Sequence, residues 1–270
     1  MSRLTAVFSA LHEKQRTALI PFITAGDPSI GGVVALLHTL VAAGADALEI
    51  GVPFSDPMAD GPVIQGSSER ALARGVTLRR VLAWVREFRQ QNQATPIILM
   101  GYLNPVEILG MQRFAEEAAD AGVDGVILVD MTPEEAEEGS TLLRQAGVDP
   151  IFLLAPTSGP RRVAAVKRLG SGFVYYVSVR GITGSEQHDW DEVLARVEGL
   201  RRELDMPLAI GFGIRDAATA QRLAQGADAV VIGSALVQIL QQAQDDQDAQ
   251  RLATEFLAPI RAALDAGASA

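Results

Sequence analysis

Residues 47–62 read ALEIGVPFSDPMADGP, a short alternating strand that runs into a loop rich in glycine, proline and aspartate. Leu48 and Ile50 fall on one face of the strand and Glu49 falls on the other, because side chains alternate along a strand. The strand therefore aims one carboxylate away from its apolar face, and two more carboxylates follow in the loop. In a barrel of parallel strands, this carboxyl end is where catalytic residues lie.

Short strands alternate with amphipathic helices along the rest of the chain. The expected strands are 18–24, 47–51, 96–102, 125–130, 150–154, 172–178, 208–213 and 229–233. The expected helices are 31–43, 68–91, 107–121, 133–146, 160–169, 190–203, 216–225 and 248–265. Eight strand-then-helix units indicate an α/β fold, a (β/α)8 TIM barrel formed as a single domain by residues 1–270. We also expect an extra N-terminal helix at 3–14 and a short helix at 236–240.

Turn signals agree with this architecture. Asp27 is expected to open the first barrel helix, and Thr132, which precedes Pro133, is expected to cap the fourth. Four helix ends carry a Gly-x-Asp step, in which the glycine ends the helix before the next strand. The steps are Gly44-Ala45-Asp46, Gly122-Val123-Asp124, Gly147-Val148-Asp149 and Gly226-Ala227-Asp228. They fall on the amino-terminal face of the barrel, so we assign them to folding and stability.

Composition narrows the classes of function. The chain has 270 residues, 48% of them hydrophobic, and a formal net charge of -10, which argues against nucleic acid and anionic membranes as main partners. Because it has no cysteine, thiol catalysis, disulfides and cysteine-bound metals are excluded. No apolar run approaches the ~18 residues that span a bilayer. The first sixteen residues do not resemble a signal peptide, so we expect a cytoplasmic protein.

Glycines and small polar residues follow the last three expected strands. Gly184 comes after the sixth strand, Gly213 ends the seventh, and Gly233 and Ser234 end the eighth just before the short helix. Backbone N–H groups of glycine and a helix N-terminus form a cradle for anions, and barrels place phosphate at this edge. Turns need glycine as well, so each glycine alone indicates little. The three sites in this order favour a phosphate-binding site.

Glu49 is the leading candidate for catalysis. A carboxylate in an apolar barrel mouth should have a raised pKa and suit proton transfer near neutral pH. The alternative is an ion pair inside the barrel, but no arginine lies on an expected strand, and the nearest, Arg180, is in a loop. Asp56 and Asp60 resemble turn residues first, because aspartate is common beside glycine and proline in loops.

Three aromatic residues, Phe22, Tyr102 and Tyr175, lie in expected strands near the barrel mouth. Single aromatics usually belong to a core, but three at one mouth would suit a flat aromatic substrate. Two long loops on the same face, 52–67 and 179–189, are candidate lids, although a tolerated surface insertion is the alternative. The three histidines are scattered over two helices and a loop, so the sequence predicts no metal site.

The chain resembles the tryptophan synthase alpha subunit family over nearly its whole length. The most specific match is LEIGVPFSDPMADGPVIQ at residues 48–65. The other matches, in family order, are PFITAGDP (21–28), MGYLNP (100–105), YYVS (175–178), GITG (181–184) and GFGI (211–214). The resemblance implies retro-aldol cleavage of indole-3-glycerol phosphate to indole and glyceraldehyde 3-phosphate.

The resemblance also implies roles for single residues. Glu49 would be the general acid and base, Asp60 would bind the indole N–H, and Tyr175 would lie with them at the catalytic centre. Pro53 and Asp56 would face a tryptophan synthase beta subunit in an alpha2-beta2 heterotetramer. That partner would hold pyridoxal phosphate and receive the indole, whereas this chain would need no cofactor. The implied substrate-binding residues are Phe22, Met100, Tyr102, Ile127, Thr183, Gly184, Gly213, Gly233 and Ser234.

Chemistry read from the residues agrees with the family. Carbon–carbon cleavage needs an electron sink, but both lysines, Lys14 and Lys167, lie in expected helices rather than at strand ends, and no metal ligands cluster. The substrate would then supply the sink, because protonation of indole C3 gives an indolenine that accepts the electrons. Glu49 can move the protons and Asp60 can stabilise the acidic N–H, which overrides the assignment of Asp60 as a turn residue.

Two departures from the family and three alternatives stay open. Arg180 stands where the family usually has a smaller residue, and Val129 adds bulk near the pocket; both bear on loop closure and rate rather than on the reaction. A stand-alone indole-3-glycerol phosphate lyase would share every catalytic residue, and only activation by a partner separates the two. A sugar-phosphate isomerase would need a different base pattern, and a catalytically silent phosphate-binding subunit would not need the carboxylate pair.

Overall fold

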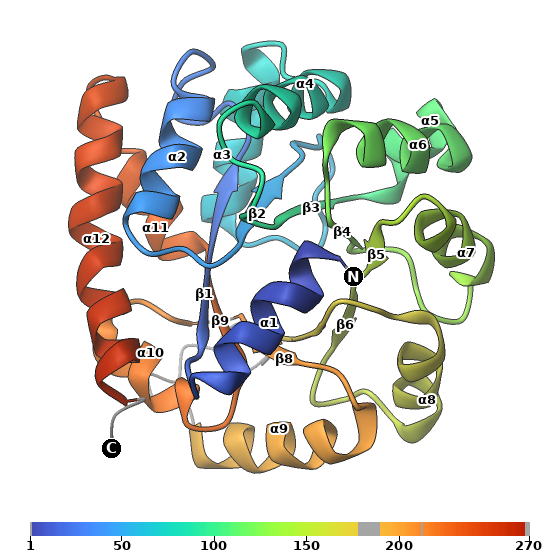
Figure 1. Ribbon diagram of the computed structural model, residues 1–270. Coiled ribbons are helices and arrows are strands. Elements are labelled where there is room, and N and C mark those ends of the chain that lie inside the picture. Colours follow the sequence, from blue (N-terminus) through green and yellow to red (C-terminus); the bar gives the residue numbers. More distant parts are fainter. Residues whose placement is uncertain (1, 178–189, 212, 268–270) are drawn as a thin grey trace.

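Parallel strands form a ring with helices on its outside in the computed structural model, which describes residues 2–177, 190–211 and 213–267 (Figure 1). The strands in these ranges pair in the order β5-β4-β3-β2-β1-β9-β8-β7-β6. They are β1 (Ala18–Thr24), β2 (Leu48–Gly51), β3 (Ile97–Gly101), β4 (Gly125–Leu128), β5 (Asp149–Pro150), β6 (Phe152–Leu154), β7 (Val174–Tyr176), β8 (Leu208–Ile210) and β9 (Ala229–Ile232). The expected parallel barrel is confirmed.

The ring closes at the fifth expected strand. Only Ile151 separates β5 from β6, so the two ends of the strand order are one continuous segment. The first half pairs with β4 (Gly125↔Asp149), and the second half pairs with β7 (Phe152↔Val174). The expected strand 150–154 is thus divided between its two neighbours, which tilt apart around the barrel.

The helices cover the ring and one of its ends. They are α1 (Arg3–Glu13), α2 (Val33–Ala42), α3 (Pro62–Ala73), α4 (Leu78–Arg89), α5 (Leu103–Leu109), α6 (Met111–Ala121), α7 (Glu137–Gln145), α8 (Pro160–Leu169), α9 (Trp190–Leu204), α10 (Ala217–Ala224), α11 (Ser234–Leu240) and α12 (Asp246–Gly267). Both the extra N-terminal helix and the short helix after the last strand are present. None of the helices described here is both long and apolar enough to cross a membrane.

The expected helix 68–91 is two helices, and the expected loop 52–67 is shorter than predicted. Helix α3 already begins at Pro62, and proline is favoured at the first position of a helix. The loop therefore ends at Gly61. Gly75 then separates α3 from α4 with a φ of 76°, and the side chain of Thr77 caps α4 by accepting a bond from the Arg80 N–H. The proline, glycine and threonine that set these boundaries can all be recognised in the sequence.

Other helix boundaries also differ from the expectation. Gly110, with a φ of 90°, divides the expected helix 107–121 into α5 and α6. Helix α7 starts at Glu137. The carbonyl of Thr132 accepts a hydrogen bond from the Glu135 N–H and closes a turn before the helix, so Thr132 does not cap it. Asp27 does not open α2 either: α2 starts at Val33, and the Asp27 carboxylate binds arginines of α3.

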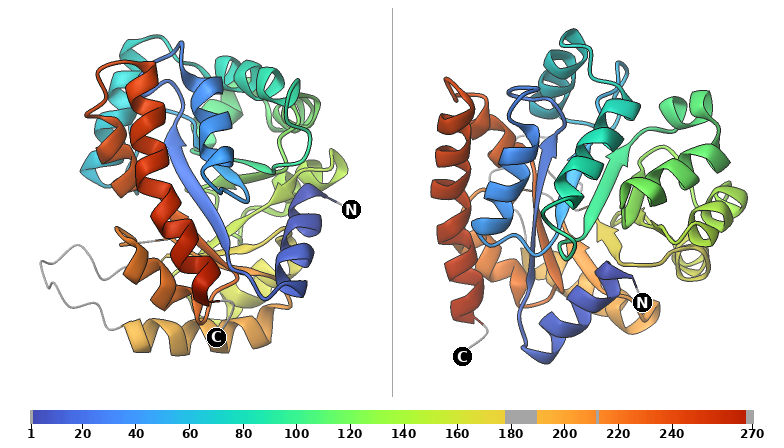
Figure 2. Two further views of the ribbon diagram at one scale, coloured as in Figure 1. Left: turned by 60° about the vertical axis from the view of Figure 1, so that its left-hand side comes forward. Right: turned by 45° about the horizontal axis from the view of Figure 1, so that its top comes forward.

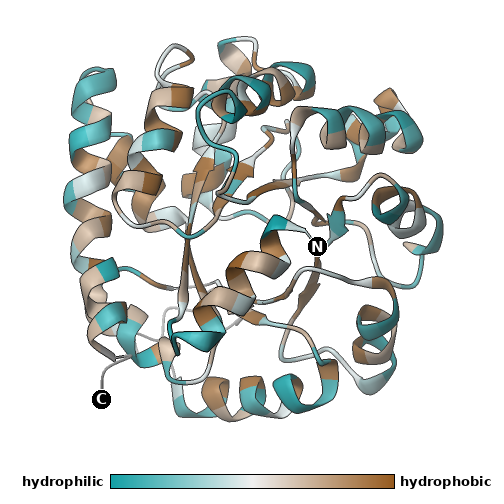
Figure 3. Cartoon of the chain, in the orientation of Figure 1, coloured by the Kyte–Doolittle hydropathy of each residue, from teal (hydrophilic) through white to brown (hydrophobic). Residues whose placement is uncertain are grey.

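Strand side chains divide into two apolar layers. Leu48 and Ile50 pack outward against the helices, whereas Ala47 belongs to the inner layer, as the alternation of β2 predicts. Leu4 and Phe8 of α1 complete that inner layer, so α1 closes one end of the barrel (Figures 1 and 2). The strands are accordingly mostly apolar, with Glu49 on β2 as an exception, while the surface helices carry hydrophilic residues on their outer sides (Figure 3).

Aspartates of the Gly-x-Asp steps tie neighbouring strands together at the amino-terminal face. Asp46 accepts a hydrogen bond from the Leu19 N–H (2.9 Å), and Asp228 accepts one from the Leu208 N–H (2.8 Å). The glycines of the first three steps have a positive φ, whereas Gly226 does not. These bonds serve the fold, and they leave the opposite end of the barrel for chemistry.

Candidate active site

Glu49 lies on β2 with its side chain inside the barrel, and only 1% of it is exposed. Among the described residues, neither of its carboxyl oxygens has a hydrogen-bond partner. Burial raises the pKa of Glu49 to about 8, and the nearby charge of Asp60 adds to the shift. Glu49 is therefore mostly protonated at neutral pH, which suits a group that must first donate a proton.

Asp60 lies near this carboxyl group, in the loop between β2 and α3. Burial raises the pKa of Asp60, while a hydrogen bond from the Tyr102 hydroxyl opposes the shift. The same hydroxyl accepts a hydrogen bond from the Ala59 N–H at 3.1 Å. Because burial also raises the pKa of Tyr102, its hydroxyl stays neutral and can serve both neighbours.

Tyr175 completes this group from β7 on the other side of the barrel. It is buried, and its pKa is raised well above the ordinary value by burial and by the charges of Glu49 and Asp60. The structure thus brings together the three residues that the sequence analysis named as catalytic. A buried neutral acid, a second carboxylate and a neutral phenol can transfer protons and stabilise a developing positive charge.

Two glycines make room for the aromatic side chains, a relationship that the sequence analysis missed. A β-carbon built on Gly51 would lie 2.5 Å from Cζ of Phe22, and one built on Gly211 would lie 2.0 Å from the hydroxyl oxygen of Tyr175. Phe22 also lies beside Gly233. Glycine at these strand positions is therefore required for the shape of the barrel mouth.

Met100 and Ile127 face the same interior from β3 and β4. They are register partners, and Met100 also pairs with Gly51. Ile127 is fully buried, whereas Met100 is half-buried. Val129, the bulkier departure from the family, is half-buried and packs against the same inner layer. The wall expected to meet a flat substrate is therefore apolar.

The expected phosphate cradle is described only in part. Gly213 has a φ of 73°, Gly233 precedes α11, and Ser234 is the exposed first residue of that helix. Gly184 and Thr183, like the whole expected lid 179–189 with Arg180, lie outside the described residues.

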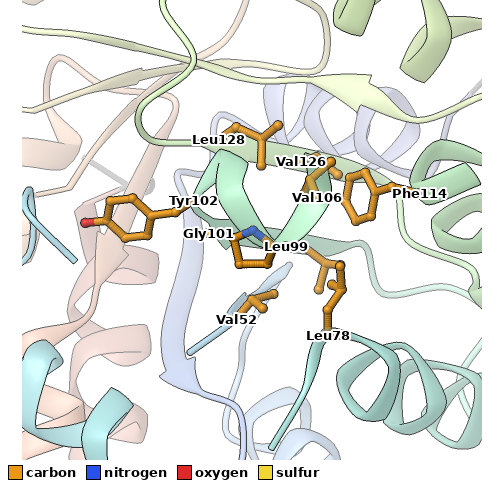
Figure 4. A pocket seen from close by; sticks show the side chains of 10 residues that line it. Val52, Leu78, Leu99, Gly101, Tyr102, Val106, Phe114, Val126 and Leu128 are labelled. Atoms are coloured by element: carbon orange, nitrogen blue, oxygen red, sulfur yellow. The ribbon is translucent and has the colours of Figure 1, made fainter. Parts of the chain in front are cut away.

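Tyr102 stands between an apolar layer and the loop of Asp60. Its ring borders a small apolar space behind β3, lined also by Val52, Leu78, Leu99, Gly101, Pro105, Val106, Phe114, Val126 and Leu128 (Figure 4). The hydroxyl points away from those side chains, and the ring stacks on Phe54 with 5.2 Å between centroids. Sequence reasoning placed Tyr102 near the substrate but missed its contacts with the loop.

The loop also carries the residues expected to face a partner. Asp56 is exposed, but Pro53 is buried, so Pro53 would affect a partner only through the shape of the loop. Two large apolar side chains are strongly exposed: Met58 in this loop (86%) and Ile108 in α5 (82%). In the described part of the chain, no group of three or more acidic or histidine side chains is arranged to hold a metal ion.

Comparison with known proteins shows the family of this chain. A family model of the tryptophan synthase alpha chain matches residues 8–264. The chain belongs to this family. It is 66% identical to the tryptophan synthase alpha chain of Acidithiobacillus ferrooxidans over 98% of this chain and 97% of that one. It is 57% identical to that of Cupriavidus taiwanensis, over 98% and 100%. Among solved structures, the tryptophan synthase alpha subunit of Legionella pneumophila superposes with a TM-score of 0.93 at 40% identity, over 98% and 99%. The resemblance seen in the sequence motifs is confirmed, and with it membership of a lyase family that cleaves indole-3-glycerol phosphate.

Proposed function

We propose that Glu49 and Asp60 carry the retro-aldol cleavage of indole-3-glycerol phosphate in this chain. Membership of the tryptophan synthase alpha chain family gives the reaction, and the residues that perform it are the proposal. The observation that carries it is the buried Glu49 carboxyl group, which has a pKa near 8 and a second carboxylate beside it. A structural carboxylate would be paired, whereas this one has no hydrogen-bond partner among the described residues and can meet a ligand.

Protons and electrons balance with these two groups. Glu49 in its acid form donates a proton to C3 of the indole, which gives an indolenine cation whose N–H faces the Asp60 carboxylate. The Glu49 carboxylate then accepts the proton of the hydroxyl on the carbon bound to C3. The bond between that carbon and C3 breaks, its electron pair returns to the ring, and indole and glyceraldehyde 3-phosphate are released. Glu49 ends protonated, as it began.

The remaining walls fit the two ends of this substrate. Phe22, Met100 and Ile127 would contact the indole ring, with Tyr175 beside the reacting carbon. Gly213, Gly233 and Ser234, together with Thr183 and Gly184, would hold the phosphate through N–H and hydroxyl groups. An overall negative chain can bind phosphate in this way, because neutral backbone dipoles supply the attraction.

A beta subunit is the proposed partner and the source of the pyridoxal phosphate that acts on the indole. The loop with Pro53 and Asp56 would face it in an alpha2-beta2 heterotetramer. Exposed Met58 and Ile108 support a docking surface here, because covering a large apolar side chain with a partner removes it from water, which is favourable. Residues 1–270 would act as one barrel domain, and the cytoplasm stays the expected compartment.

Indole release from indole-3-glycerol phosphate, measured with and without a cognate beta subunit, tests the function. We expect slow release by the isolated chain and a strong increase when the beta subunit is added. Fast release that ignores the partner would instead indicate a stand-alone lyase. No release under either condition would contradict the proposal.

A further inference from the structure

The loop that carries Asp60 is bound from outside by a side chain of α3. Gln65 donates a hydrogen bond from Nε2 to the carbonyl oxygen of Asp60 at 2.8 Å, and the same amide lies 3.5 Å from the carbonyl oxygen of Pro57. The Asp60 N–H in turn donates to the Pro57 carbonyl at 3.0 Å. One amide group therefore holds both ends of the turn that presents the Asp60 carboxylate.

The Tyr102 phenol also binds this turn. The Ala59 N–H donates to the Tyr102 hydroxyl, and the neighbouring Met58 is almost fully exposed. Hydrogen bonds therefore help to set the position of this turn. Gln65 and Tyr102 both bind its backbone, the first from α3 and the second from the position just after β3.

Helix α3 is itself fixed to the rim of the barrel. Asp27, which is buried, receives two hydrogen bonds from Arg70 at 2.8 and 2.7 Å, a bidentate geometry that fixes orientation. The buried hydroxyls of Thr24 and Ser67 are 2.6 Å apart. Gln65 thus projects from a helix that is anchored to the loop after β1, so it can hold the backbone of Asp60 in a fixed position.

We propose that Gln65 is a positioning residue for the reaction: it sets the place of the Asp60 carboxylate near Glu49 through the backbone of residues 57–60. The inference rests on the role proposed above for Asp60. Because an error of about 1 Å in a reacting group can cost about 100-fold in rate, loss of this hold should appear in kcat more than in KM.

The test is the turnover of indole-3-glycerol phosphate by Gln65→Leu and Gln65→Glu in the complex with the beta subunit. We expect kcat to fall at least ~10-fold in Gln65→Leu with KM changed little, and to fall further in Gln65→Glu, which turns a carboxylate toward two carbonyl oxygens. Gln112→Leu is the matched control, because the Gln112 amide binds Glu116 on its own helix α6 and belongs neither to α3 nor to the Asp60 loop. It should keep wild-type kcat.

A second comparison separates positioning from general stability. Added to Asp60→Asn, Gln65→Leu should cause no further loss, because it acts through the carboxylate that is already absent. If the residual rate is too low to compare, the N–H groups of Ala59 and Asp60 should exchange with deuterium faster in Gln65→Leu than in Gln112→Leu.

Four results would overturn the inference. A Gln65→Leu enzyme with wild-type kcat, while Asp60→Asn is inactive, would sink it and leave the proposed function intact. An equal loss in the wild-type and Asp60→Asn backgrounds, or unchanged exchange at residues 59–60, would show that Gln65 does not act through Asp60. Wild-type turnover by Asp60→Asn would overturn both this inference and the assignment of Asp60 itself.

Discussion

The ring of Phe22 occupies the space that a β-carbon on Gly51 would need. The built β-carbon lies 2.5 Å from Cζ and 2.8 Å from Cε2 of the ring, well inside van der Waals contact. Phe22 and Glu49 are register partners on β1 and β2, so Gly51 sets where the aromatic wall stands relative to the Glu49 carboxyl group. The shape of the pocket is thus encoded in a residue that has no side chain.

Gly51→Ala should therefore damage the site more than the fold. The methyl group must displace the ring of Phe22, and we expect kcat/KM for indole-3-glycerol phosphate to fall at least ~10-fold. Phe22→Leu in the same chain should restore part of the loss by removing the clash. The control is Gly199→Ala in α9, where the methyl group meets nothing within 4 Å. Equal activity of Gly51→Ala and Gly199→Ala would contradict the argument.

Glu49→Gln should abolish turnover and change how stability depends on pH. The folded-state pKa of Glu49 is raised from 4.5 to about 8, so the folded protein binds the proton more tightly than the unfolded chain does. Its favourable contribution is full below pH 4.5 and is lost as pH rises to about 8. The variant should gain free energy of unfolding relative to wild type over that window, by up to roughly 5 kcal/mol. Urea unfolding of both proteins at pH 5 and pH 9 tests this; a pH-independent difference would refute it.

The pH–rate profile should carry the same signature. Because Glu49 must begin as an acid, kcat/KM should fall as the pH rises through about 8. Tyr102→Phe removes the hydrogen bond that opposes the raised pKa of Asp60, so the acidic limb should move to higher pH. An acidic limb that is the same in wild type and Tyr102→Phe would contradict this argument. Either the reaction would not require the charge of Asp60, or the Tyr102 hydrogen bond would not lower the pKa of Asp60.

The barrel could be predicted from sequence because its signal repeats. Alternation in segments such as 47–51 fixes which face is inside, and eight such segments leave few other topologies. The predicted helix boundaries were wrong where one local signal competed with another. Gly75 and Gly110 lie within continuous helical periodicity, which masks the glycine signal that ends a helix. Thr132 resembles a cap in sequence, but the chain there closes a turn before the helix begins.

Only the positions of single site residues could be predicted from the sequence, and not the contacts between them. Strand alternation places Glu49 inside without any knowledge of its neighbours. The pairing of Asp27 with Arg70 and the fit of Tyr175 over Gly211 join segments distant in sequence, and the contact of Gln65 with the Asp60 carbonyl depends on the path of the loop between them; no local pattern encodes these contacts. Physical reasoning from one sequence therefore names the reacting groups but not the groups that position them.

Ile108→Asp should weaken the response to the beta subunit without changing the chain's own indole release. Ile108 is 82% exposed at the end of α5, away from the barrel interior, so its loss leaves the site intact. A charge in an apolar contact must be desolvated, and we expect the beta subunit concentration for half-maximal activation to rise at least ~10-fold. Gln91→Asp, at an exposed position after α4, is the control. An unchanged activation curve would place the docking surface elsewhere.

Asp124→Asn should do the reverse and cost stability while sparing the chemistry. Asp124 is buried on the amino-terminal face, where it binds the Arg89 guanidinium at 2.7 Å and accepts a bond from the Ile97 N–H at 2.8 Å. Burial lowers the pKa of Arg89 only to about 10, so the variant leaves a buried positive charge unpaired at neutral pH. Breaking such a pair costs about 3 to 5 kcal/mol. Asp120→Asn, which removes the exposed pair with Arg86, should cost less than about 1 kcal/mol. Chemical unfolding of both variants, with kcat/KM measured alongside at 25 °C, decides the point, since equal losses of stability would mean that burial of the Asp124 pair adds nothing.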